Sequence, residues 1–455
     1  MAGVANQPVR NGSAGLIKGK ERSCMNGRLR QHIDGQAISD THEHIIASAT
    51  LRGHKRGLIE FIGESYLHDD IISVGGTEEC FSPQGAEETR WEKLRPYLAR
   101  VRNTTYYRCL TAALNDLFCL DYTDIDDDSW REYHERLLCA AAEGEKWYRH
   151  VLHDKAHIVH CMLDMDRTTD TEVGLWEGKG LKSIKDNRFE AQFFTRVSRT
   201  DLLLNIVFPG ARREIEQLYG LEIRGVEDID ELVRRFVRRA GEQHSVCYKS
   251  VAAYFRTLSF PFVDRTTASR CFARVLNETA APRDLLDVQN YIMHLVLAAA
   301  KQDGKPIQFH TGMQALNANT VNHSNPLHLN DLFLRYPTVK FTLLHGGYPF
   351  CAEAGVIVKK FPNVYLDFSW LPQMGYAAAR HALEEWLDLV PMSKITWGGD
   401  CRHVENAYSA VLLLRGLLYE ILDRRIREGK LDMDIAIEIV QKIMYDNAVD
   451  IYGLA

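Results

Sequence analysis

Eight short apolar runs, rich in β-branched or aromatic residues, constrain the fold of this chain more than any other feature. Longer stretches with helical periodicity separate several of them, such as residues 285–304, which Gly304 closes as a C-terminal cap would. Eight strands that alternate with helices predict a parallel (β/α)8 barrel of the TIM type, whose chemistry gathers at the C-terminal ends of its strands. The runs are Ala37–Ile46, His157–Met165, Ala191–Ser198, Ser245–Tyr254, Pro306–Gly312, Val339–Gly347, Asn363–Trp370 and Lys394–Asp400.

The spacing between the runs is irregular in one place. More than 100 residues separate the first run from the second, and this segment has helical periodicity. We therefore expect a helical insertion at residues 45–150, placed over the barrel mouth, within a barrel that spans residues 31–455. Residues 1–30 are rich in Gly, Asn and Ser, and we expect a flexible segment there.

Composition excludes several classes of function. The chain has 45% hydrophobic and 25% charged residues, as an ordinary globular protein does, and its formal net charge is −6. That charge argues against nucleic-acid binding, and no apolar stretch approaches the length of a membrane span. The N-terminus lacks the apolar core of a signal peptide, and the ten cysteines show no paired spacing. These features predict a cytoplasmic protein.

The first run, "AISDTHEHII", places two histidines two residues apart. On a strand, residues i and i+2 project from the same face, so His42 and His44 would converge on one point. Asp40 would lie one layer below them, and Glu43 would project from the opposite face. Neutral imidazole is the commonest nitrogen ligand of metal ions, so the motif offers two adjacent ligand positions.

Metal-competent side chains stand at the ends of three further runs. The fifth run ends with His310, the sixth with His345 and the eighth with Asp400. The C-terminal ends of barrel strands meet at one face, so these side chains would share a single site with the two histidines of the first run. Four strand ends that supply such a set predict a metal site.

These residues carry a family resemblance. The DxHxH motif, with His310, His345 and Asp400, resembles the amidohydrolase superfamily, and the ending "IMYDNAVDIYGL" is similar to the last helix of its amidohydrolase-related branch. The segments "FHTGM", "HSNPL", "HGGYP" and "KSVAAYFR" resemble a subgroup that also occurs fused to glutamine synthetase. The uronate isomerases are more distant relatives on the same barrel.

The resemblance implies a role for each residue. His42, His44 and Asp400 would hold the metal, and His310 would be a further ligand or face the bound water. His345 would bind a second metal or polarise the substrate carbonyl. Asp400 would act as the general base, since a divalent cation brings the pKa of its water near neutrality.

Lys249 lies on the fourth run, where binuclear members of the superfamily carry a carboxylated lysine that bridges two metals. An unmodified Lys249 would instead neutralise a substrate carboxylate or form an ion pair, and both readings stay open. We expect one ion rather than two. A ligand set of imidazoles with a carboxylate suits zinc, and manganese or iron also remain open.

Arginines at strand ends can bind a carboxylate through two hydrogen bonds. Arg196 and Arg199 follow the third run, Arg256 the fourth and Arg402 the eighth. We expect Arg196, Arg256 and Arg402, with Trp370 at the end of the seventh run, to bind the substrate. Ion pairs to barrel helices are an equally good reading for each arginine.

These observations predict a metal-dependent hydrolase of a small amide, lactone or related carbonyl compound, with Asp400, His310 and His345 in catalytic roles. A sugar-acid isomerase and a non-oxidative decarboxylase are alternatives on the same barrel, and a scaffold without chemistry is the non-enzymatic one. We expect a small-molecule substrate, anionic or polyhydroxylated, and neither a nucleic-acid nor a membrane partner. A homo-oligomer is expected because dimers are common for this barrel.

Overall fold

The barrel is built from eight parallel strands that follow one another in chain order. The computed structural model describes residues 27–48, 56–164, 189–317 and 319–454. Backbone hydrogen bonds from Thr41 to Trp397 (3.2 Å) and from His44 to Cys401 (2.9 Å) join the first strand to the segment after the last. The predicted (β/α)8 barrel is therefore confirmed. Its strands are β1 (Ile38–Glu43), β2 (Ile158–Leu163), β3 (Thr195–Arg199), β4 (Cys247–Ser250), β5 (Ile307–His310), β6 (Phe341–Leu344), β7 (Val364–Asp367) and β8 (Ile395–Thr396).

Each strand overlaps one predicted run and is shorter than that run, and the largest difference at a strand start is at β3. The third run begins at Ala191, whereas β3 begins at Thr195 because residues 191–193 form a turn. Phe193 and Phe194 are buried beside this turn and explain the apolar character of the run before the strand. The strand extends one residue further than predicted and includes Arg199.

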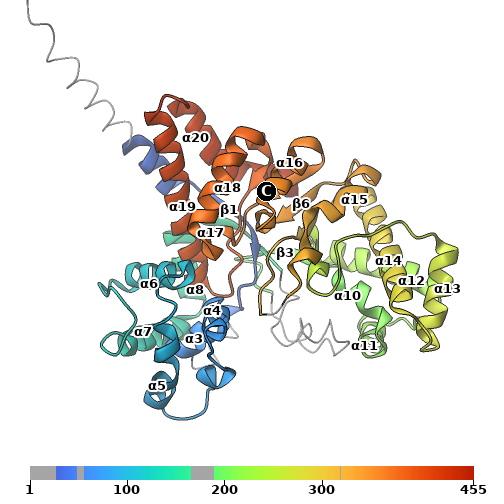
Figure 1. Ribbon diagram of the computed structural model, residues 1–455, viewed down its shortest axis with the longest axis horizontal. Helices are drawn as coiled ribbons and strands as arrows, with labels where there is room; N and C mark the ends of the chain where they lie inside the picture. Colours follow the sequence, from blue (N-terminus) through green and yellow to red (C-terminus); the bar gives the residue numbers. More distant parts are fainter. Residues whose placement is uncertain (1–26, 49–55, 165–188, 318, 455) are drawn as a thin grey trace, which may run out of the picture.

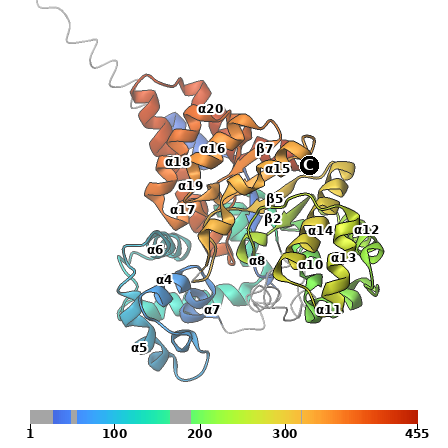
Figure 2. The ribbon, with the colours of Figure 1, turned by 45° about the vertical axis from the view of Figure 1, so that its right-hand side comes forward.

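Helices surround the barrel on both flanks (Figure 1). Helices α10–α14 lie on the opposite side from the insertion, as two views show (Figures 1 and 2). Within the described residues, no helix has the length and apolar character needed to cross a membrane. The barrel helices are α10 (Asp201–Leu204), α11 (Pro209–Tyr219), α12 (Val226–Glu242), α13 (Arg265–Leu276), α14 (Pro282–Asp303), α15 (Asn330–Arg335), α16 (Cys351–Lys360), α17 (Leu371–Met374), α18 (Tyr376–Leu389), α19 (Val404–Arg427), α20 (Met433–Gln441) and α21 (Asn447–Tyr452).

The segment between β1 and β2 forms a group of helices with a core of its own. Phe61, Trp91, Leu110 and Tyr133 are among the buried residues of this core, which is separate from the main barrel core. The group packs on the barrel mainly through α6 and α19, where the Tyr408 hydroxyl donates to Asp116 (2.5 Å). Its helices are α3 (Leu58–Glu64), α4 (Leu67–Ser73), α5 (Glu87–Leu98), α6 (Thr105–Phe118), α7 (Trp130–Glu143) and α8 (Glu145–Arg149).

The C-terminal helix α21 fills the interior of the barrel away from the strand ends that carry the site. Ile451 and Tyr452 pack with Met162, an inward-facing residue of β2. The Tyr452 hydroxyl donates to Thr342 (3.0 Å) and accepts from the Gln308 amide (3.1 Å), so the floor has buried polar contacts as well as apolar ones.

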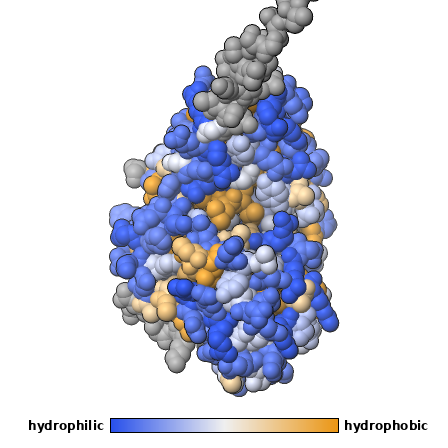
Figure 3. All heavy atoms as spheres, turned by 90° about the vertical axis from the view of Figure 1, so that its left-hand side faces the viewer, coloured by the Kyte–Doolittle hydropathy of each residue, from blue (hydrophilic) through white to orange (hydrophobic). Residues whose placement is uncertain are grey.

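Residues 27–35 are helical, and both Leu29 and Ile33 are fully buried against the barrel core. Residues 27–30 were expected to be flexible and instead belong to this helix; residues 1–26 lie outside the described part of the chain. The face of the molecule on the left-hand side of Figure 1 is mostly hydrophilic, with an apolar area near its middle (Figure 3).

Candidate metal centre

The two histidines of the first strand meet Asp400, which follows β8. The His44 Nε2 atom lies 3.3 Å from the Oδ1 atom of Asp400, and the His42 Nε2 atom lies 3.6 Å from the same oxygen. The two imidazole rings are 4.7 Å apart, edge to face. The convergence expected from their i, i+2 spacing is present, and the partner they share comes from the other end of the barrel sheet.

The rest of the DxHxH motif is arranged differently from a regular strand. The pairing of β1 with β2 shifts register between Asp40 and Glu43, as at a β-bulge. Asp40 and Glu43 both accept hydrogen bonds from the loop that carries Asp400, so the expectation that Glu43 projects from the opposite face is wrong. Burial raises the pKa of Asp40 to about 7, and burial next to Asp40 also raises the pKa of Glu43.

The carboxyl groups of Asp40 and Glu43 hold the loop that carries Asp400. Asp40 accepts a hydrogen bond from the Gly399 amide (3.1 Å), and Glu43 accepts one from the Cys401 amide. The Asp400 amide in turn donates to the His42 carbonyl (2.7 Å). The backbone on both sides of Asp400 is thus attached to β1, which explains why the motif begins with Asp40.

Three residues at strand ends have left-handed backbone conformations. The φ angles of His345, Trp370 and Asp400 are 64°, 64° and 55°. Such angles are uncommon for residues other than glycine and are maintained only where surrounding contacts enforce them, often at functional sites. They follow β6, β7 and β8 and turn these three side chains toward one another.

His345 and His310 lie beside Asp400 and complete a cluster of side chains that could bind a metal. We call it the metal-competent cluster, and its members are His42, His44, His310, His345 and Asp400. The Nδ1 atom of His345 lies 3.5 Å from Asp400 Oδ2, and its Nε2 atom is 2.9 Å from His310 Nδ1. His310 Nε2 donates to the Met313 carbonyl (2.9 Å), which fixes the ring. Burial lowers the pKa of His345 well below its usual value, and the neighbouring His310 and Lys249 lower it further.

Lys249 is fully buried at the edge of this cluster. Its Nζ atom lies 3.4 Å from His42 Nε2. Burial lowers the pKa of Lys249 to about 8, against the opposing effect of Asp164 and Asp400. The position predicted from the fourth run is therefore inside the site, next to a candidate ligand.

The residues fit a metal ion. One ligand atom each from His42, His345 and Asp400 lie within 4.8 Å of one another, and no more than 2% of any of these residues is exposed. Imidazole nitrogens with a carboxylate oxygen form the usual donor set of zinc in proteins. A buried set of this kind at the C-terminal ends of barrel strands is a candidate metal site.

Sequence reasoning missed Asp164 and the role of Arg199 in supporting this set. The Nδ1 atom of His44 donates to the Asp164 carbonyl (2.9 Å), which leaves Nε2 to face Asp400. The Asp164 side chain accepts from Arg199 Nη2 (2.5 Å), and both side chains are fully buried. Asp164 directly follows β2, so the rule that found the other residues could also have found it.

The insertion contributes a third missed residue, Tyr66. Its hydroxyl donates to Asp400 Oδ1 (3.0 Å), and its ring packs on Trp370 at a centroid distance of 4.5 Å. Trp370 in turn meets the His345 ring edge to face at 5.5 Å and is 1% exposed. Trp370, predicted to bind substrate, therefore packs against the side chain of His345, one of the candidate ligands. Tyr66 packs beside it, and no strand pattern could have indicated this tyrosine.

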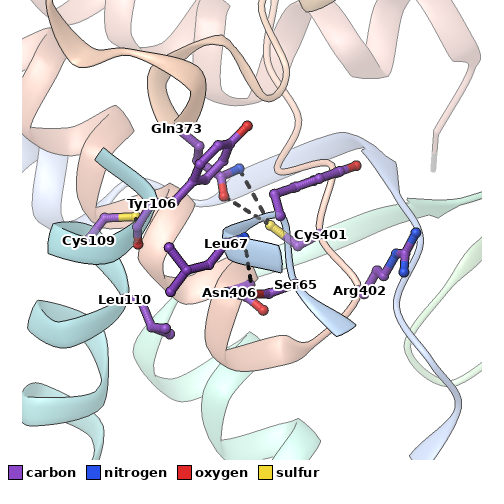
Figure 4. Close-up of a pocket in the computed structure, with 10 residues that line it drawn as sticks. Ser65, Leu67, Tyr106, Cys109, Leu110, Gln373, Cys401, Arg402 and Asn406 are labelled. Atoms are coloured by element: carbon purple, nitrogen blue, oxygen red, sulfur yellow. Dashed lines mark hydrogen bonds between the residues drawn. The ribbon is translucent and has the colours of Figure 1, made fainter. Parts of the chain in front are cut away.

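The structure brings one of the three predicted arginines near the cluster. Arg402 lines a small cavity between the insertion and α19, together with Tyr66, Tyr106 and Asn406 (Figure 4). The Gln373 amide borders the same cavity and donates to the Gly399 carbonyl (2.5 Å), so this wall of the cavity also supports the loop before Asp400.

Arg196 and Arg256 are placed elsewhere. Arg196 stacks over Phe189 at 4.2 Å, on the side of β3 opposite to Arg199. The buried Arg256 donates to Gln289 (3.1 Å) and Asn290 (2.7 Å) on α14. These contacts hold both side chains in the structure, and the expectation that they bind substrate stays a prediction.

Comparisons with known proteins agree with this assignment. A family model described as amidohydrolase matches residues 274–454. Protein fluG of Emericella nidulans is 31% identical over 222 residues, which cover 46% of this chain and 26% of that protein. The chain therefore spans about a quarter of the length of this curated relative.

Solved structures share the whole fold. Glucuronate isomerase from Caulobacter crescentus aligns with a TM-score of 0.73 at 14% identity, over 95% of this chain and 94% of its own. Uronate isomerase from Thermotoga maritima gives 0.71 at 15% identity over 94% and 97%. A protein assigned as a metal-dependent hydrolase from Lactobacillus casei gives 0.65 at 17% identity over 93% and 97%. Residues 274–454 thus match an amidohydrolase family model, and the chain as a whole shares the fold of these solved structures.

Proposed function

We propose that this protein is a metal-dependent hydrolase of small amides, lactones or related carbonyl compounds. The observation that carries the proposal is the convergence of His42, His44 and His345 on the single carboxylate of Asp400. The family match and the neighbour assigned as a metal-dependent hydrolase support the same class. We propose zinc as the ion, with manganese or iron as alternatives of similar ligand preference.

Each side chain of the site would have a separate role in hydrolysis. A bound cation would polarise the substrate carbonyl and lower the pKa of a water molecule. Asp400 would take the proton from the attacking water and deliver it to the leaving group, since its oxygens lie at the centre of the cluster. The Tyr66 hydroxyl would hold Asp400 Oδ1 in orientation, and Trp370 would keep bulk water from the reacting atoms.

We propose one ion rather than two. Lys249, in contact with His42, places its own amino group where a second cation would need a bridging ligand. A carboxylated Lys249 would change this count. Metal analysis of the wild type beside Lys249→Ala decides the question: one ion in both proteins supports the proposal, and two ions reduced to one by the substitution would contradict it.

The test of hydrolysis combines metal content with isotope incorporation. Purified protein should contain one metal per chain, and His42→Ala should lose it. Products formed in ¹⁸O-labelled water should carry the label, and Asp400→Asn should lower turnover at least about 100-fold while most of the metal stays bound. A chain that takes up no metal under any loading condition would contradict the proposal.

Isomerisation of a sugar acid is the second candidate. It is favoured by the alignment of two uronate or glucuronate isomerases over at least 94% of the chain, which includes the insertion. The Tyr66 hydroxyl and the Asp400 carboxylate together could relay a proton between adjacent carbons, and Arg402 would bind a carboxylate. Exchange of a substrate hydrogen with solvent, without release of a fragment, would establish this reading and exclude hydrolysis.

A further inference from the structure

Residues 65–73, which we call the strap, cross the barrel mouth between two sets of strand-end loops. The strap consists of Ser65, Tyr66 and helix α4 and belongs to the insertion. On one side, Tyr66 donates to Asp400 and packs on Trp370. On the other side, Asp69 meets the loop that follows β5. The strap thus contacts the metal-competent cluster from above and touches both sides of the site.

Asp69 makes the contacts on the β5 side. Its Oδ2 atom accepts from the Leu316 amide (2.9 Å), and its carbonyl accepts from the Asn317 side-chain amide (3.4 Å). Leu316 has a φ of 69°, a strained conformation for leucine that turns its amide toward the strap. The Nδ1 atom of His68 is hydrogen-bonded to the other carboxylate oxygen of Asp69, Oδ1 (3.1 Å), and orients the Asp69 side chain.

The same loop supports a candidate ligand. The Ala315 amide donates to the Tyr254 hydroxyl (2.9 Å), and the Tyr254 ring packs on His310 at 4.6 Å. The carbonyl of Met313, also in this loop, accepts from His310 Nε2 (2.9 Å). Asp69 therefore joins the strap to the loop that fixes His310, while Tyr66 joins it to Asp400.

The cluster beneath the strap is sealed. His42, His345 and Asp400 are at most 2% exposed, and so is Cys401, which borders the small cavity beside Tyr66. A molecule larger than water can reach such a site only when a covering element moves, and an element held by a few polar contacts opens at low cost. Among the described residues, Tyr66 and Asp69 join the strap to the barrel side of the mouth, Tyr66 through the Asp400 carboxylate and Asp69 through its own carboxylate.

We propose that Asp69 is the latch of the strap: its hydrogen bonds to Leu316 and Asn317 keep the metal site closed, and their release admits ligands. This inference rests on the proposed metal site. Asp69 does not touch the reacting atoms, and it acts by positioning Tyr66. It therefore determines how fast the site exchanges its contents rather than which residues hold the metal.

The test follows release of zinc from the zinc-loaded full chain to a strong chelator. Asp69→Ala should release zinc about tenfold faster than the wild type, since it removes a charge-assisted hydrogen bond. Asn317→Ala, at an exposed position, should accelerate release less and guards against misfolding of the first variant. Glu78→Gln is the matched control: it removes the acid on the far side of His68, leaves Asp69 in place, and should release zinc at the wild-type rate.

Alkylation of Cys401, followed by mass spectrometry of its peptide, provides a readout that needs no metal. Its rate should rise in the same order, Asp69→Ala above Asn317→Ala above the wild type, with the melting temperature unchanged in Asn317→Ala. Equal rates in all proteins, or an equal rise in Glu78→Gln, would overturn the latch. If the chain binds no zinc, the proposed metal function fails, and the alkylation rates still decide the latch.

Discussion

The barrel and the helical insertion contribute to the site in different ways. The barrel supplies its metal-competent groups from the ends of short, fully buried strands, and each is fixed by backbone contacts such as the bond from the Asp400 amide to the His42 carbonyl. The insertion reaches the same point with one hydroxyl, that of Tyr66, from a separate core. The groups proposed to hold an ion are thus on the barrel, and the group proposed to cover it is on the strap.

This difference implies that substitutions at the strand ends should have larger effects than those in the insertion. The largest effect is expected for Asp400→Asn, which keeps the shape of the side chain and removes the base. We expect turnover to fall about 100- to 10,000-fold, with metal content measured in parallel to show that the site still forms. The control is Asp388→Asn, which changes an exposed acid on α18. Equal losses of turnover in both variants would contradict the role of Asp400.

The contact between the barrel and the insertion should make the stability of the fold decrease at acid pH. Arg56 donates to His403 Nδ1 (2.6 Å), and Glu64 of the insertion lies 3.2 Å from His403 Nε2. Burial, followed by the charge of Arg56, lowers the pKa of His403 to about 4 from 6.5. Between these values the unfolded chain binds more protons than the folded one, so stability is present above pH 6.5 and is lost as the pH falls toward 4.

The loss should reach about 3 kcal/mol across that window, from the size of the pKa difference. Urea unfolding at pH 7.0, 5.5 and 4.5 measures it. His403→Gln can still accept from Arg56 and should flatten the decline, whereas His381→Gln, at an exposed histidine, should leave it unchanged. A decline of the same steepness in all three proteins would show that His403 does not link the regions.

A substitution that adds a side-chain atom at the loop after β8 should destabilise the barrel. A Cβ atom at Gly399 would lie 2.0 Å from Glu43 Oε1 and 3.2 Å from Asp40 Oδ2. Gly399→Ala should therefore lower the free energy of unfolding by about 1–3 kcal/mol, as overpacking does in cores. In Gly241→Ala nothing lies within 4 Å of the new atom, and stability should be unchanged or higher. Denaturant titrations of both variants test this contrast.

Tyr66→Phe should give the smallest of these effects. It removes the hydroxyl on Asp400 and keeps the ring that packs on Trp370. Loss of one hydrogen bond to a charged group corresponds to about a tenfold fall in kcat/KM, with metal content unchanged. The conservative control is Tyr97→Phe on α5 of the same insertion. A fall as large as that of Asp400→Asn would mean that the insertion carries chemistry and would break the comparison.

The sequence allowed the fold and most of the cluster to be predicted because both follow from one rule. Parallel strands end at the same face of a barrel, so His310, His345 and Asp400 could be placed together from their positions after apolar runs. The same rule applied to Asp164, which was overlooked. Glu43 was misplaced because a bulge in β1 interrupts the alternation, and no residue pattern marks that bulge.

The rule that strand ends meet at one face could not predict where the arginine side chains point or how the insertion packs. Arg196 and Arg199 lie on β3 and Arg256 follows β4, yet the direction of each side chain depends on register and on partners such as the amides of α14. Tyr66 and Asp69 lie in a helical segment whose packing on the barrel is set by contacts between distant residues. Helical periodicity predicts that such a segment exists and buries one face, and it does not predict which residue reaches the mouth.

The pairing of Asp40 with Gly399, which are 359 positions apart, has a consequence for biosynthesis. A ribosome that adds about 5–20 residues per second needs roughly 20 to 70 seconds to make the second partner after the first. Throughout that interval β1 has no neighbour on one side, and His42 and His44 have no Asp400. The nascent chain must therefore keep an unpaired strand edge from aggregation, and the proposed metal ligands can meet only after residue 400 has been made.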